Sequence, residues 1–329
     1  MTFLMHYAVR PLLFSVPFLL SSAAGAAYAP PEQVVVKDST IIVTGKKLTK
    51  EEARRQASAF VRTATVIPQE DQFARRRDPL CPAVSGIEAK YVVKVVAKIT
   101  SVADAVGVKM AKPGCSPNLL VHFTNDVSGY IAQMAKTRPD LLRTMRPDER
   151  LALKQSAVPM RWLYATEARG SDNMQLSLGG KSASVLMPGG SGIGAGGDVT
   201  IGNEAVNLQS NRGTLNTYSA SLIDTQMIVN LTSTIVIVDA EKSTGFTLES
   251  VAAHAAMVSL AQIKLSTDYS TYPSILSMFS VIKGADEAPR DLTEWDYAYL
   301  RALYKTPANR TARVQRTRIY SEMVKQLVK

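Results

Sequence analysis

The sequence predicts an α+β protein with mixed strands and helices, a buried central helix in its C-terminal half and a helical tail. Three observations lead to this prediction. Short apolar stretches alternate with amphipathic helical patterns in the first half of the chain. The stretch "ESVAAHAAMVSLAQ" is apolar on nearly all sides, which is typical of a buried helix. Beyond residue 290, polar helical patterns continue to the C-terminus.

The N-terminal residues have the pattern of an export signal. Arg10 precedes the apolar run "PLLFSVPFLL" and a series of small residues. Cleavage could follow Ala26 or Ala29, and we favour Ala26 because Pro30 would follow the second cut. An uncleaved anchor is the alternative, but the run is short and serine-rich for a bilayer span. We therefore expect a periplasmic or secreted protein with no membrane span after cleavage.

The chain divides by composition into five predicted segments. They are a signal peptide (1–26), a proline-led leader (27–37), an N-terminal α+β unit (38–165), a Gly/Ser-rich loop or insertion (166–215) and a C-terminal strand-helix unit with a basic helical tail (216–329).

In the N-terminal unit, "TIIVTG" predicts a strand and "LTKEEARRQASAFVRTA" a helix with a Thr49–Glu52 capping box. Residues 87–106 have helical periodicity. "NLLVHFTND" predicts a strand that carries His122 on the face opposite its alternating apolar row, and a polar helix follows.

The Gly/Ser-rich segment predicts a surface loop, of which residues 186–198 should be mobile and dispensable. Its "GIGAGG" is not placed between a strand and a helix as a dinucleotide site requires. Its "GGKS" lacks the first glycine of a phosphate loop, because Gln175 stands there. We therefore expect no nucleotide cofactor.

In the C-terminal unit, "SASLIDTQMIVNLTSTIVIVDA" predicts one or two strands, and the alanine-rich helix begins at Thr247. Thr293 and Asp296 form the capping box of a later helix. Asp296 and Glu294 are close in sequence, but residues two apart on a helix point to different sides. Helix capping explains Asp296 without a catalytic role.

The chain has two cysteines, Cys81 and Cys115. In an oxidising compartment such a pair favours one disulfide, which would close the loop of residues 81–115. Two buried free thiols are the alternative.

The C-terminal tail is basic. From Lys305 onward it has seven Lys and Arg residues and one acidic residue, Glu322, in a chain of formal charge +10. Its arginines are a candidate contact for a polyanion such as an anionic envelope component: Arg310, Arg313, Arg316 and Arg318. A solvated helix face is the alternative, and no nucleic acid is expected.

His254, in the middle of the alanine-rich helix, stands where a zinc protease would begin His-Glu-x-x-His. Ala255 and Val258 replace the general base and the second ligand, so no metal site is predicted. We expect His254 to be a structural core histidine with one nitrogen hydrogen-bonded.

No G-x-S-x-G motif occurs after the signal, and only His122 and His254 could act as a base there. No catalytic residue is predicted.

Four stretches resemble an uncharacterised family of exported proteins from Gram-negative bacteria: "DPLCPAVSGI", "CSPNLLVHFTND", "VIVDAEKSTGFTLESVAAHAAMVSLAQ" and "YPSILSMFS…LTEWDYAYLRALYK". The resemblance covers roughly residues 40–325 without the glycine-rich insert. The C-terminal half also resembles zinc-metalloprotease-like proteins with a degenerate motif, which carry Glu and Gln on this helix. Gln262 is the polar residue of that kind here. The resemblance implies a protease-like scaffold and names no substrate.

Two functions fit these patterns. The first is a non-catalytic binding or envelope-associated module on a protease-like scaffold. The second is a hydrolase, peptidase-like, whose site is not recognisable from the sequence.

Overall fold

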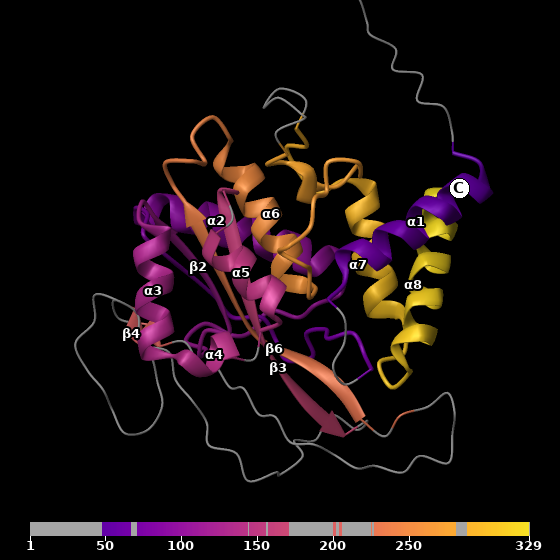
Figure 1. The fold of residues 1–329 in the computed structure, drawn as a ribbon, viewed down its shortest axis with the longest axis horizontal. Coiled ribbons are helices and arrows are strands. Elements are labelled where there is room, and N and C mark those ends of the chain that lie inside the picture. Colours follow the sequence, from indigo (N-terminus) through magenta and orange to yellow (C-terminus); the bar gives the residue numbers. More distant parts are fainter. Residues whose placement is uncertain are drawn as a thin grey trace, which may run out of the picture. The chain divides into compact units, whose positions relative to one another are not determined.

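Four strands form one mixed sheet at the centre of the fold (Figure 1). The computed structural model describes residues 48–66, 71–143, 145–155, 157–170, 200–201, 204–205, 225, 227–280 and 288–328. The strand order is β1 (Pro82–Ser85), β2 (Leu119–Thr124), β6 (Met227–Asp239) and β3 (Met160–Gly170). The first three strands are parallel, and β3 is antiparallel to β6. The α+β class is therefore confirmed.

The described residues also form eight α-helices, one 3-10 turn and a two-residue strand pair. The helices are α1 (Lys50–Ala64), α2 (Ala89–Ala105), α3 (Val127–Thr137), α4 (Pro139–Arg143), α5 (Pro147–Gln155), α6 (Leu248–Leu260), α7 (Glu294–Lys305) and α8 (Ala312–Leu327). The turn is η1 (Ile275–Ser277), and the small pair is β4 (Thr200–Ile201) with β5 (Glu204–Ala205). No helix in these described ranges is long and apolar enough to cross a membrane.

Helices cover both faces of the sheet. On one face, α2 and α6 pack against each other, and Tyr164 of β3 donates a hydrogen bond from its hydroxyl to the Val258 carbonyl of α6 at 2.8 Å. On the other face, Tyr130 of α3 stacks on His122 of β2. A separate group is formed by α1, α7 and α8, which pack on one another beside the sheet (Figure 1).

Helix starts follow the sequence signals. The Thr49–Glu52 box caps α1, and the Thr293–Asp296 box caps α7, both as predicted. Thr247 caps α6 by accepting a hydrogen bond from the Ser250 N–H at 3.1 Å. Every residue from Ser250 to Leu260 is buried, which confirms the buried central helix.

The strands β1 and β3 were not predicted from the sequence. Residues 219–240, for which one or two strands were predicted, contribute one long strand, β6, to the described part of the chain. Because β3 pairs with β6, the sheet unites strands from the predicted N-terminal and C-terminal units. The predicted strand "TIIVTG" and the stretch 186–198 lie outside the described residues.

Two buried arginines donate hydrogen bonds to carbonyls at the C-terminal ends of α6 and α7. Arg75, only 1% exposed, donates from Nη1 to the carbonyls of Leu303 at 2.6 Å and of Thr306 at the end of α7. Arg76 donates to the Ser259 carbonyl in the last turn of α6. Such carbonyls lack partners within the helix, so these side chains fix the ends of α6 and α7 relative to each other.

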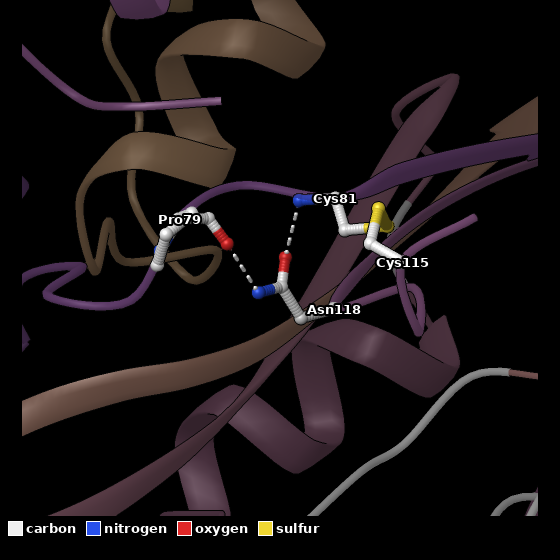
Figure 2. Close-up of a disulfide and its surroundings, with 4 residues drawn as sticks. All are labelled: Pro79, Cys81, Cys115 and Asn118. Carbon is white, nitrogen blue, oxygen red and sulfur yellow. Dashed lines mark hydrogen bonds between the residues drawn. A yellow bond between two sulfur atoms is a disulfide. The ribbon is translucent and has the colours of Figure 1, made fainter. Parts of the chain in front are cut away.

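The predicted disulfide between Cys81 and Cys115 is confirmed, with Cα atoms 6.2 Å apart (Figure 2). It connects the residue before β1 to the loop that leads into β2. Figure 2 shows Asn118 beside it, accepting a hydrogen bond from the Cys81 N–H and donating one to the Pro79 carbonyl, both at 2.9 Å. The edge strand β1 is therefore held by a covalent link and a side-chain bridge.

Candidate functional site

An apolar cavity of about 820 Å³ lies between α5, α6, β3 and the segment that follows α6. Its size falls within the range of small-molecule sites, roughly 300–1,000 Å³. Aliphatic and aromatic side chains form most of its lining: Leu151, Ala152, Val158, Met160, Trp162, Leu265, Tyr269, Leu276 and Phe279. His254 of α6 lines the same cavity.

The His254 imidazole lies between two aromatic rings. The ring centroid of Trp162 is 5.6 Å away and that of Phe279 is 5.3 Å away. The side chain is 2% exposed, as expected for a core histidine. Its Nδ1, however, has no hydrogen-bond partner among the described residues. An unpaired buried polar atom costs about 1–3 kcal/mol, so a hydrogen bond to this nitrogen would be favourable.

Burial determines the charge state of this histidine. It lowers the pKa of His254 from 6.5 to about 3, because the cation would lose its hydration. The ring is therefore neutral at pH 7, with one nitrogen that accepts a hydrogen bond and one that donates. A neutral imidazole in an apolar cavity can recognise a single polar group on an otherwise apolar molecule.

The cavity wall formed by the segment after α6 is anchored to α5. The buried carboxylate of Glu149 accepts hydrogen bonds from the Leu265 N–H at 2.7 Å, the Ser266 N–H at 3.1 Å and the Ser266 hydroxyl. The Trp162 indole N–H donates to the Ile263 carbonyl at 2.9 Å. These contacts fix the two sides of the cavity relative to each other, so it is preformed.

The cavity rim is acidic. Asp148 and Asp268 belong to the lining, and none of the lining residues within the described ranges is Lys or Arg. Asp148 forms a paired contact with Arg146, at 3.0 Å from Nε and 3.2 Å from Nη2. Leu151 is 54% exposed there.

The other residues singled out in the sequence lie apart from this cavity. Asp296 is fully buried and accepts hydrogen bonds from Ser274, Ile275 and Thr293, so it links η1 to the start of α7. Burial raises the pKa of Asp296.

The two glycine motifs lie outside the described residues. Within the described ranges, no three or more His, Cys, Asp or Glu side chains gather as metal ligands would.

The four tail arginines do not share one face. Arg313 and Arg318 are exposed on α8, but they are five positions apart, which rotates one from the other by roughly 140° around the helix. The Arg316 guanidinium lies over the Phe73 ring, 5.7 Å from its centroid. Arg310 precedes α8 and is half-buried.

Comparison with known proteins identifies no relative: no family model, no curated protein and no solved structure matches the chain.

The sequence did not indicate the cavity residues Trp162, Glu149 and Leu151. The roles of Trp162 and Glu149 depend on contacts with a segment about a hundred residues away in sequence. One signal was present: Leu151 and Leu153 are only two residues apart in "PDERLALKQ", so a helix cannot bury both on one face.

The burial of His254 predicts a pH-dependent stability. The pKa of His254 in the folded protein lies below its value in the unfolded chain. As the pH falls from 6.5 towards 3, the unfolded chain therefore binds a proton at this residue that the folded protein does not. The free energy of unfolding decreases over this range. Between about pH 7.5 and about pH 5 this residue should account for a loss of about 2 kcal/mol. Urea unfolding at both pH values, with His254→Leu as the reference, measures it. Equal pH dependence in the two proteins would contradict a buried neutral imidazole.

Proposed function

We propose that this protein is a binding module whose cavity holds an apolar molecule that donates one hydrogen bond to Nδ1 of His254. The observation that carries the proposal is the unpaired, buried nitrogen of His254 in a mostly apolar cavity of ligand size. The exposed Leu151 at the rim supports it, because a ligand would cover that side chain.

The charges around the cavity favour a neutral or cationic ligand. Asp268 would repel an anion, whereas the Asp148 charge is paired with Arg146. The aromatic rings of Trp162, Tyr269 and Phe279 are compatible with a cation. A fatty acid anion would meet the Asp268 carboxylate and a neutral histidine, so it should bind more weakly than the alcohol or amine of the same chain length.

We also propose that the protein acts outside the cytoplasm. The Cys81–Cys115 disulfide is consistent with an oxidising compartment. The export signal and the protease-like scaffold remain predictions from the sequence. Neither is needed for ligand binding by the cavity.

Titration with the neutral dye N-phenyl-1-naphthylamine tests the proposal. Its fluorescence should rise and saturate as the apolar cavity takes it up. Ala152→Trp places an indole in the cavity and should weaken binding at least about tenfold, which is 1.4 kcal/mol. Lys154→Trp is the matched control, because Lys154 is exposed on the same helix and does not line the cavity.

Competition with dodecan-1-ol, dodecylamine and dodecanoate then tests the charge preference. The alcohol and the amine should displace the dye at lower concentration than the carboxylate. Dye binding that is absent, or unchanged by Ala152→Trp, would contradict the ligand site. Equal displacement by all three would contradict only the charge preference.

A further inference from the structure

A second feature, separate from the cavity, is a serine paired with a histidine. The Ser85 Oγ lies 2.9 Å from Nδ1 of His122. Ser85 is the last residue of β1, and His122 lies directly opposite it in β2. Both side chains are half-buried, so neither is sealed in the core. A serine within hydrogen-bond distance of a neutral imidazole is the arrangement that activates a serine nucleophile.

The place of this pair in the fold is one where α/β sheets bind ligands. Both residues are at or near the carboxyl ends of parallel strands. After β1 the chain enters α2, which packs with α6 on one face of the sheet, whereas after β2 it enters α3 on the other face. Adjacent strands whose connections leave to opposite faces open a crevice at their carboxyl ends.

A third residue holds the imidazole in position. The Tyr130 ring stacks on His122 with centroids 4.4 Å apart and planes 25° apart. Burial lowers the pKa of His122, so the ring is neutral at pH 7 and its Nδ1 can accept the Ser85 proton. A nucleophile, a base and a group that orients the base are therefore together.

The backbone after Ser85 turns sharply into a helix. Gly86 has φ +83°, and a Cβ there would lie 1.9 Å from the Phe123 carbonyl oxygen, so only glycine fits. The helix α2 starts three residues later, and its cap residue Glu88 makes no side-chain hydrogen bond to the first turn in the described structure. The Tyr91 N–H donates to the Glu88 carbonyl at 2.9 Å, which leaves the Ala89 and Lys90 N–H groups of this first turn for a negatively charged oxygen near Ser85.

From this geometry we propose that Ser85 is an acyl-accepting nucleophile, with His122 as its base and carboxylic esters as its substrates. The Ser85 Oγ attacks the ester carbonyl carbon while its proton moves to Nδ1 of His122. The bond to the leaving alcohol breaks, and the alcohol oxygen takes that proton. Water then attacks the acyl-serine, with His122 accepting and returning a proton. The products are the acid, the alcohol and free Ser85.

An alkyl fluorophosphonate probe tests this step directly, because an activated serine displaces fluoride and keeps the phosphonate. Incubation of the full chain with the probe should add one probe mass, located at Ser85 by peptide mapping. Ser85→Ala should abolish the labelling, and His122→Gln should slow it at least about tenfold. Ser101→Ala is the control, because Ser101 is exposed on α2 without a histidine partner in the described structure.

The melting temperature of each variant shows whether it is folded. Alanine fits where serine stands, so Ser85→Ala remains informative even if His122→Gln fails to fold. Folded wild-type protein that is not labelled would overturn the proposal, and so would labelling that persists in Ser85→Ala. Neither result bears on dye binding by the His254 cavity.

Discussion

Replacing Arg76 with methionine should lower the free energy of unfolding by about 3 kcal/mol. Arg76 is 3% exposed, and its guanidinium donates to the Ser259 carbonyl from Nε at 3.4 Å and from Nη2 at 3.2 Å. It also donates to the Thr232 carbonyl at 3.3 Å and to the Thr234 hydroxyl at 3.0 Å. One side chain therefore joins the end of α6 to β6.

The size of this effect follows from two opposed contributions. Methionine keeps the apolar stem but leaves two buried acceptors, on Ser259 and Thr234, and one half-buried acceptor, on Thr232, without this donor. Each buried acceptor is worth about 1–3 kcal/mol. The loss is partly offset because a buried cation is removed, and burial already lowers the pKa of Arg76 to about 10.

Arg77→Met is the matched control, one residue along the chain. The Arg77 side chain is exposed, so the same substitution should change stability by less than about 0.5 kcal/mol. Urea unfolding followed by circular dichroism measures both variants. An Arg76→Met protein as stable as Arg77→Met would show that the end of α6 does not need this arginine.

Removing the disulfide should have an effect of similar size. The bond spans a sequence separation of 34 residues, for which loop-closure entropy gives about 3–4 kcal/mol. The loop contains β1 and α2, so the reduced chain must order an edge strand and a long helix without that restraint. The Asn118 bridge to Cys81 and Pro79 would remain and hold β1 in part.

The double variant Cys81→Ala/Cys115→Ala and the wild type under reductant should lose stability by the same amount within about 1 kcal/mol. If the two losses of stability agree, the loss comes from the missing disulfide bond and not from the packing of the sulfur atoms. A double variant with wild-type stability would contradict a stabilising role for the bond.

Local signals in the sequence were sufficient for several elements. The capping boxes at Thr49 and Thr293 place the starts of α1 and α7, because a cap depends on residues only three apart. The apolar composition around His254 predicts its burial. The cysteine pair predicts the disulfide.

Features that depend on distant pairing could not be predicted in this way. The strand β1 has four residues and is defined by its register with β2. The contact between Ser85 and His122 arises from that register, and no spacing along the chain indicates it. The cavity likewise requires Glu149 to bind a segment more than a hundred residues away.

The most direct test of the ligand cavity is the nitrogen spectrum of the His254 ring, recorded with and without dodecan-1-ol. His6 lies in the predicted signal peptide, so the exported protein should contain two histidines, and His254→Leu assigns them. The expected result is a shift of the unprotonated Nδ1 resonance of His254 towards that of a hydrogen-bonded nitrogen, with His122 unchanged. A saturating concentration of the alcohol that leaves the His254 resonances unchanged would contradict a ligand site at this cavity.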